Sequence, residues 1–383
     1  MEWVCILIVP VTVFQFILVF GVVVYLTLNL IHLVRVEPVR GSLPNSPFIS
    51  ICVPARNEER GIRSCLTSLL NQNYPHFEVI AVNDHSTDAT GDIIQSLASE
   101  FSNLHTLECQ PLPSDWLGKP FALYQAARQA RGDYLIFTDA DPVFQPHALT
   151  TAVHVMTVRD LDMLTLMPGT EFGSFWERAV QPVIFGFIVA LSRFKKINSP
   201  DHTTAMGFGA FIMVKKDVYE RIGGHEGVKY EVLEDVMLAK RAKKAGCNLL
   251  AADAKSIFSI RMYHSLQEIW TGWRKNIFIA MKKSIVRTVY YICVIVGFLV
   301  TPWLVLFWNV WQGTGILLTG TALVALLMTL TASIHLCNEL RLPRRNAFLF
   351  PIGAFVMSAI MVNSMFQVLV KRQTEWRGRK YSA

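Results

Sequence analysis

The chain has 383 residues, of which 52% are hydrophobic and 17% charged, with a mean hydropathy of +0.35 and a formal net charge of +7. This composition excludes an ordinary soluble protein and predicts that part of the chain lies in a membrane. The cations lie mostly beside apolar segments, which favours an anionic lipid surface over nucleic acid as partner. The seven cysteines lack zinc-site spacing, so we expect buried thiols in a reducing compartment.

Residues 1–35 are predicted to form a transmembrane anchor. No Asp, Glu, Lys or Arg occurs from Trp3 to Val34, and about 20 apolar residues suffice to cross a bilayer. A cleaved signal peptide is the alternative, but the basic start and the small-residue cleavage site of such a peptide are missing. Arg35 and Arg40 follow, and the positive-inside rule places them in the cytoplasm.

Residues 36–287 have the pattern of one α/β domain, in which apolar strand-like runs alternate with amphipathic stretches. The predicted strands are 48–54, 77–82 and 134–137, and the predicted helices are 59–70, one through 93–97, and 121–131. Residues 83–88 are expected to cap the second helix, and Gly132 to stop the third. The alternation predicts a parallel sheet whose ligands bind beyond the carboxyl ends of its strands.

Two carboxylates directly follow the predicted strand 134–137. Asp139 and Asp141 stand one residue apart where this strand ends. Such a pair is a hard oxygen site for Mg²⁺ or Mn²⁺ carrying substrate phosphates. The alternative is a turn with Asp as a helix N-cap.

Polar residues follow the other two predicted strands at the same edge. Asn57 and Glu58 follow the first strand, and Asp84 follows the second. An amide or carboxylate there can hydrogen-bond the base or ribose of a nucleotide. The alternatives are a capping role for Asp84 and a first-turn acid for Glu58.

Four segments occur in the order 53–58 (VPARNE), 82–88 (VNDHSTD), 139–141 (DAD) and 234–235 (ED). This order resembles glycosyltransferase family 2, the inverting enzymes with a GT-A fold that use nucleotide sugars. The resemblance implies an α/β GT-A domain with a Rossmann-like mixed sheet, beside helical transmembrane segments. It also implies a divalent metal, Mn²⁺ or Mg²⁺, at Asp141 and Asp139. The implied nucleotide-sugar contacts are Pro54, Ala55, Arg56, Asn57, Glu58, Asp84, Lys119 and Asp139.

Residues 112–119 (LPSDWLGK) are similar to an element of membrane-bound members, which resemble hopene-associated and carotenoid glycosyltransferases. Gly118 lets the backbone approach a ligand, and Lys119 offers a point charge to a phosphate. The alternative for Lys119 is a solvated loop lysine. The resemblance places Trp116, Gly209 and His225 on the acceptor or diphosphate side. The alternative for the glycines in residues 207–209 and 223–224 is that they only form turns.

Glu234 and Asp235 open a predicted amphipathic helix. Inverting sugar transfer needs a base that takes the proton from the acceptor hydroxyl. By family position, Asp235 is the expected base, and Glu234 orients it or the acceptor. The alternative is two acids favoured by a helix N-terminus.

Residues 261–276 precede the second apolar region, where many processive members carry Q-x-x-R-W. This string is missing from the chain, which disfavours polysaccharide synthesis. Arg261, Trp270, Trp273 and Arg274 are assigned to the acceptor or diphosphate side. An interfacial amphipathic helix over about 265–284 explains these aromatic and basic residues equally well.

Residues 288–370 form the predicted C-terminal transmembrane region of about three helices, because 288–338 and 346–370 contain no charged side chain. With the anchor, this makes four spans. Four spans would place the basic tail 371–383 outside, against the positive-inside rule. Either one segment is interfacial or the tail breaks the charge bias.

The sequence therefore predicts a multi-pass enzyme of the cell membrane with a cytoplasmic catalytic domain. We expect it to transfer a hexose from a UDP-linked nucleotide sugar to a lipid hydroxyl of the carotenoid, hopanoid, sphingolipid or glycerolipid type. The expected partners are the nucleotide-sugar donor, the membrane lipid acceptor and the bilayer, with no nucleic acid and no protein partner evident. The alternatives are a polyprenyl-phosphate sugar synthase, a polysaccharide synthase, or a catalytically silent lipid-binding scaffold.

Overall fold

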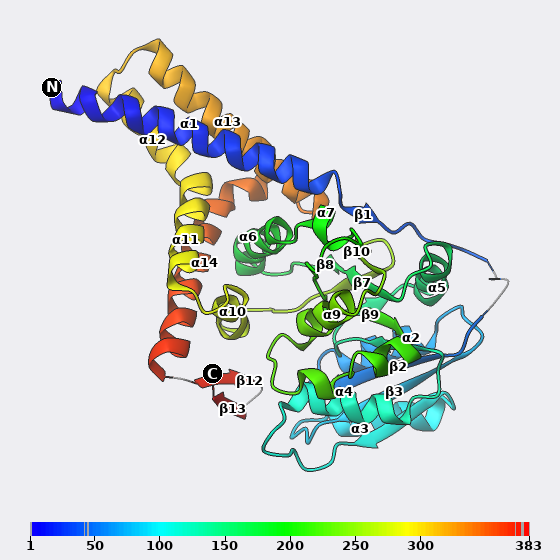
Figure 1. Cartoon of the computed structure of the whole chain (residues 1–383). Helices are drawn as coiled ribbons and strands as arrows, with labels where there is room; N and C mark the ends of the chain where they lie inside the picture. Colours follow the sequence, from blue (N-terminus) through cyan, green and yellow to red (C-terminus); the bar gives the residue numbers. More distant parts are fainter. Residues whose placement is uncertain (1, 42, 44–45, 372, 377–378, 383) are drawn as a thin grey trace. The chain divides into compact units, whose positions relative to one another are not determined.

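The computed structural model describes residues 2–41, 43, 46–371, 373–376 and 379–382 (Figure 1). It divides into two compact units. The α/β unit comprises residues His32–Glu171 and Ser192–Met262. The helical unit comprises Met1–Ile31, Phe172–Leu191 and Tyr263–Ala383. Residues 1, 42, 44 and 45, and residues 372, 377, 378 and 383 of the basic tail, lie outside the described residues.

The α/β unit is built on an eight-stranded sheet in the order β1-β10-β7-β9-β5-β2-β3-β4. Strand β9 is antiparallel to both β5 and β7, and the other neighbouring strands are parallel. A smaller sheet has the order β6-β11-β8. The large-sheet strands are β1 (Val34–Arg35), β2 (Ile49–Ala55), β3 (Phe77–Asn83), β4 (Leu104–Glu108), β5 (Tyr134–Phe137), β7 (Met163–Met167), β9 (Ile212–Lys215) and β10 (Leu249–Asp253). The small-sheet strands are β6 (Val143–Phe144), β8 (Gly169–Thr170) and β11 (Phe258–Ile260).

Helices cover both faces of the large sheet. The helices of this unit are α2 (Ile62–Leu70), α3 (Thr90–Glu100), α4 (Gly118–Gln129), α5 (Ala148–Val158), α7 (Phe194–Ile197), α8 (Lys216–Arg221) and α9 (Glu234–Lys244), with a 3₁₀ turn at Glu226–Val228. Strand side chains alternate between the two faces. Ile51 and Val53 therefore join the core under α2, α3 and α5, while Cys52 joins the core under α4, α8 and α9.

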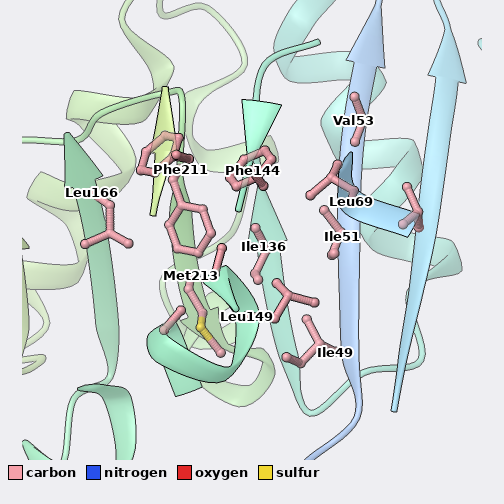
Figure 2. Packing of buried hydrophobic residues seen from close by; sticks show 14 of the residues in the cluster. Ile49, Ile51, Val53, Leu69, Ile136, Phe144, Leu149, Leu166, Phe211 and Met213 are labelled. Carbon is pink, nitrogen blue, oxygen red and sulfur yellow. The ribbon is translucent and has the colours of Figure 1, made fainter. Parts of the chain in front are cut away.

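The first core packs residues from three neighbouring strands against a helix. Figure 2 shows Ile51 of β2, Ile136 of β5 and Met213 of β9, with Leu149 of α5 packed across them. All four side chains are at most 2% exposed. Burial on both faces is the reason that these strands read as continuous apolar runs.

The predicted α/β fold with a mixed sheet is confirmed, with corrections in detail. Strand β4 was not predicted, because it is a short edge strand with exposed polar residues at His105 and Glu108. Helix α2 begins at Ile62 rather than at residue 59.

The residues that end α4 and cap α3 in the structure also differ from those predicted. Helix α4 already ends at Gln129. Gly132 instead packs against β2, where an added Cβ would lie 2.5 Å from Ser50 N. The N-cap of α3 is Ala89, and Asp88 accepts the Thr90 N–H at 3.0 Å.

The helical unit contains every long apolar helix described. Its helices are α1 (Glu2–Leu30), α6 (Phe175–Leu191), α10 (Leu266–Ala280), α11 (Ile285–Leu299), α12 (Thr301–Gln312), α13 (Ile316–Glu339) and α14 (Phe350–Phe366). A 3₁₀ turn (Arg344–Leu349) precedes α14, and a π turn (Gln367–Lys371) and the hairpin β12 (Gln373–Trp376) and β13 (Arg379–Ser382) follow it. Among the described residues, three helices are long and apolar enough to cross a membrane, and the pair α11 and α12, bent by 51°, gives a fourth candidate.

Candidate active site

The loops that follow β2 and β3 are bound to each other at the carboxyl edge of the large sheet. The Arg56 guanidinium donates to the backbone oxygen of Asp84 at 2.6 Å. The Thr87 N–H donates to Asn57 Oδ1 at 2.8 Å, and Asn57 has a positive φ of 53°. Two of the predicted nucleotide-sugar contacts, Arg56 and Asn57, therefore hold the neighbouring loop in place.

The other predicted residues of this edge lie beside that contact. Pro54 and Ala55 are the last two residues of β2, and the Ala55 carbonyl accepts the Asp84 N–H at 2.8 Å. The Asp84 side chain is buried, and its Oδ1 lies 3.3 Å from Nδ1 of His85. The structure thus brings the motifs after β2 and β3 together as one polar surface.

The carboxylates after β5 lie beside the end of β2. The thiol of Cys65, on α2, lies 3.7 Å from the backbone oxygen of Asp139. Burial raises the pKa of Cys65, and the carboxylates of Asp141, Asp139 and Glu58 raise it further. Three predicted acids from two strand ends therefore surround one buried thiol.

Lys119 joins the strand-end acids to the acids that open α9. Its Nζ lies 2.7 Å from Asp139 Oδ1 and 2.7 Å from Glu234 Oε1. Burial by itself lowers the pKa of Lys119, but the carboxylates of Asp139, Glu234 and Asp235 outweigh it, and the pKa stays well above its ordinary value. Lys119 is therefore a permanently charged cation within the acid cluster, and the solvated-loop alternative for it is wrong.

Asp235 is held by backbone donors on both carboxylate oxygens. Oδ2 accepts the Gly209 N–H at 2.8 Å, and Oδ1 accepts the Val236 N–H at 2.7 Å. Burial, and then the negative charge of Glu234, raise the pKa of Asp235 to about 7. A carboxylate with a pKa near neutrality is well matched to taking up a proton from a substrate hydroxyl.

Two glycines allow the chain before β9 to approach these acids. A Cβ on Gly207 would lie 2.1 Å from the backbone oxygen of Asp235. A Cβ on Gly209 would lie 3.2 Å from both Asp235 Oδ2 and Lys119 Nζ, and 3.4 Å from Asp139 Oδ2. Gly209 thus lies against the acid cluster, and a side chain there would require these groups to shift.

A cavity of about 10 Å³ lies within the cluster, roughly the size that holds one water molecule. Its polar lining consists of Lys119, Glu234, Asp235, Thr138 and His225.

His225 lies on the buried side of this cavity. Its Nδ1 lies 2.9 Å from the Tyr219 hydroxyl, and its ring meets Phe137 edge-on at 4.6 Å. Burial and the charge of Lys119 lower the pKa of His225 to about 3, so its imidazole is neutral. His225 therefore acts as a packed wall of the site rather than as a charged group.

The remaining predicted residues lie away from this cluster. The Trp116 ring packs on Tyr124 and Phe121, with centroids 4.9 and 5.3 Å away. Arg261 is exposed just after β11.

Three of the residues assigned to the acceptor or diphosphate side are on α10, in the helical unit. Trp270, Trp273 and Arg274 therefore belong to the helical unit.

The strand-end acids fit the expected divalent cation. Within the part of the chain that the structure describes, no group of three or more His, Cys, Asp or Glu side chains converges as a metal site. Asp139 and Asp141 supply two carboxylates. A Mg²⁺ site in proteins commonly has one or two carboxylates and is completed by substrate phosphates and water.

Sequence reasoning did not find Tyr219. Its hydroxyl accepts the His225 N–H at 3.0 Å and is within hydrogen-bonding distance of the same residue's ring. A tyrosine six positions before a histidine carries no signal by itself, since the contact depends on the turn at Gly223 and Gly224, where φ is +81° and +47°.

A mixed α/β sheet with two acids after a central strand, a polar edge and a second acid pair on a later helix is the arrangement expected of a GT-A domain. Residues 50–223 match the model of glycosyl transferase family 2.

Relatives of known name agree with this family. The chain is 25% identical over 236 residues to 4,4'-diaponeurosporenoate glycosyltransferase of Staphylococcus aureus strain USA300, and equally to that of strain MRSA252. The match covers 61% of this chain and 61% of each relative. These matches support a transferase.

A solved structure has the same fold over most of its length. The mannosyltransferase PcManGT from Pyrobaculum calidifontis, in complex with GDP-Man and Mn²⁺, aligns with a TM-score of 0.54 and 18% identity, over 96% of this chain and 100% of that one. This likeness confirms the GT-A fold.

Proposed function

We propose that this protein is a membrane-bound inverting glycosyltransferase that moves a hexose from a nucleotide sugar, UDP-linked, to the hydroxyl of a lipid. The observation that carries the proposal is the cluster in which Lys119 bridges Asp139 and Glu234 at 2.7 Å each, beside Asp235. This arrangement places groups suited to a departing diphosphate next to a group suited to an attacking hydroxyl.

The nucleoside is assigned to the joined loops after β2 and β3. Asp84 has a buried carboxylate there, and Arg56 and Asn57 fix the backbone of both loops. A loop held from both sides presents its polar groups without the entropic cost of ordering them on binding.

The diphosphate is assigned to Asp139, Asp141 and Lys119. Asp139 and Asp141 would hold Mn²⁺ or Mg²⁺, which supplies positive charge to the leaving diphosphate when it is bound. Lys119 adds a fixed ammonium on the same side, where its side chain is 21% exposed. Positive groups that are already in place are the main means of stabilising such a leaving group.

Asp235 is assigned as the general base. The N–H groups of Gly209 and Val236 fix its orientation. With a pKa of about 7, it is ionised in a large fraction of molecules at neutral pH and still basic enough to take the acceptor proton. Glu234, paired with Lys119, keeps the neighbouring charge balanced.

A lipid acceptor is supported by the apolar helices and by the relatives. Three described helices can cross a membrane by length and composition, and the S. aureus relatives are named for 4,4'-diaponeurosporenoate. We place the α/β unit in the cytoplasm, where nucleotide sugars are found, and the protein in the cell membrane.

The test is an assay of the purified protein in lipid with a panel of nucleotide sugars, Mn²⁺ or Mg²⁺, and extracted lipids. We expect a glycosylated lipid with the anomeric configuration opposite to that of the donor. Asp141→Ala should abolish donor binding, and Asp235→Ala should abolish transfer but keep donor binding. Full transfer by both variants would contradict the assignment, and a nearly active Asp235→Ala would indicate a phosphate acceptor that needs no base.

A further inference from the structure

Helix α10 carries charges along its whole length. Glu268 lies in its first turn, Arg274 and Lys275 in its middle, and Lys282 and Lys283 directly after its end. Its buried face is apolar and includes Ile269, Trp273, Ile277 and Phe278. A helix with one apolar face and charges in its middle lies along a membrane surface rather than across the hydrocarbon. Its N-cap, Ser265, comes three residues after Met262, the last residue of the α/β unit.

The C-terminal end of α14 is bound to the middle of α10. Ser364 Oγ donates to the backbone oxygen of Arg274 at 2.5 Å and accepts the Phe278 N–H at 3.1 Å. The Trp270 indole donates to Asn363 Oδ1 at 3.2 Å. Strand β12, which follows α14, also lies against α10. The end of α14 is therefore at the same membrane depth as the charged residues of α10.

The beginning of α14 is bound to the same side by a different route. The chain leaves the α/β unit after Glu171, forms α6 and re-enters that unit at Ser192, so by connectivity both ends of α6 are on the same side of the membrane. The last turns of α13 meet the end of α6, where a Cβ on Gly186 would lie 2.9 Å from Leu336 Cδ2. The chain then runs through Arg341, Arg344 and Arg345 into α14.

The first turns of α14 pack on α6 as well. A Cβ on Gly353 would lie 2.0 Å from the backbone oxygen of Ala179 and 2.8 Å from Val183 Cγ2. The opposite face of α14 has an exposed apolar stripe at Ile352, Phe355, Val362 and Phe366. Helix α14 thus has one face for protein and one for lipid, and both its ends are tied to the side of the α/β unit.

We propose that α14 does not cross the membrane, although it is long and apolar enough to do so. Together with α6 and α10 it forms a layer embedded in the leaflet on the side of the α/β unit, with the exposed stripe facing the lipid tails. The crossing segments are then α1, the bent pair α11 and α12, and α13.

This arrangement removes the conflict between the number of spans and the charge of the tail. The segment 371–383 contains five cations, Lys371, Arg372, Arg377, Arg379 and Lys380, and one acid, Glu375. With three crossings it stays on the cytoplasmic side, where anionic headgroups attract basic segments.

The test is site-directed labelling of the full-length protein in sealed membrane vesicles with a membrane-impermeant maleimide. Cys5 and Cys293 are replaced by alanine, and single cysteines are introduced by Gln373→Cys in β12, Glu100→Cys at the exposed end of α3, and Gln312→Cys at the exposed end of α12. The second and third sites are the controls for the two sides.

We expect Gln373→Cys to be labelled together with Glu100→Cys in vesicles of one orientation, and Gln312→Cys only after the membrane is opened. Labelling of Gln373→Cys together with Gln312→Cys would overturn the proposal. If the introduced thiol reacts poorly, a C-terminal epitope tag can be used instead. Its removal or protection when a protease is added outside the vesicles shows on which side of the membrane the tail lies. A tag protected in the vesicles where Glu100→Cys is labelled would also overturn it.

Discussion

Lys119 and Asp139 form an ion pair, with Nζ 2.7 Å from Oδ1, between the first turn of α4 and the end of β5. The same ammonium reaches Glu234 at 2.7 Å. One side chain therefore links the acids assigned to the leaving group with the acids assigned to the acceptor. Removing its charge would leave two carboxylates facing each other in a largely buried place.

Lys119→Met should therefore destabilise the α/β unit. The Lys119 side chain is 21% exposed, and loss of one partner from such a buried pair costs about 2 to 4 kcal/mol. Lys229→Met is the matched control, because Lys229 pairs with Asp115, which is 47% exposed, and loss of an exposed pair should leave the melting temperature nearly unchanged. Thermal unfolding in detergent measures both. Equal melting temperatures for the two variants would show that Lys119 is not a structural cation.

The residues around Lys119 also show what the sequence could predict. Asp139, Asp141 and Asp84 were predictable because they directly follow apolar strand runs, and the carboxyl ends of strands meet at one edge. The contact between Lys119 and Glu234 was not predictable, because the two residues are 115 positions apart and no periodicity links them.

Helix α6 shows a second feature that the sequence alone could not predict. Its apolar residues read equally well as part of an α/β core, but the structure places the helix in the helical unit, between two segments of the α/β unit. Only tertiary packing distinguishes these outcomes, since both bury the same kind of side chain.

The rate of transfer should depend on the ionisation of Asp235. Only the deprotonated carboxylate accepts a proton, and its pKa is about 7, so kcat should rise between about pH 6 and pH 8. Asp235→Asn should lower kcat by about 10² to 10⁴-fold and flatten this profile. Glu100→Gln, at an exposed acid at the end of α3, is the control and should keep the wild-type profile. A rise that persists in Asp235→Asn would assign the ionisation to another group.

Stability should show the opposite dependence on pH. The pKa of Asp235 in the folded protein, about 7, lies above its ordinary value of 3.8, so the folded state binds the proton more tightly than the unfolded state. The contribution of Asp235 to stability is therefore fully present below pH 3.8 and is lost as the pH rises through 7. Asp235→Asn, although its kcat is strongly lowered, should lose less of its melting temperature than the wild type between these values. Parallel melting curves for the two proteins would contradict this.

Gly209→Ala should reduce activity more than stability. The new Cβ would lie 3.2 Å from Asp235 Oδ2 and from Lys119 Nζ, so both groups must shift by a few tenths of an ångström. Small displacements of catalytic groups cost on the order of 10-fold to 100-fold in rate. Gly91→Ala is the matched control, because its Cβ would lie 3.1 Å from Asn83 Nδ2, away from the acid cluster. Steady-state kinetics and melting temperature distinguish the two, and equal rates would show that the cluster tolerates the methyl group.

Gly353→Ala should weaken the packing of α14 on α6. The added Cβ would lie 2.0 Å from the Ala179 carbonyl oxygen, and because that atom belongs to a helix backbone, the two helices must separate. Overpacking of this kind costs about 1 to 3 kcal/mol. Gly320→Ala in α13 is the control, since its Cβ would meet nothing within 4 Å and alanine favours a helix by about 1 kcal/mol over glycine. The melting temperature in lipid nanodiscs should fall for Gly353→Ala and hold or rise for Gly320→Ala. An unchanged value for Gly353→Ala would mean that α14 and α6 are not in close contact in the membrane.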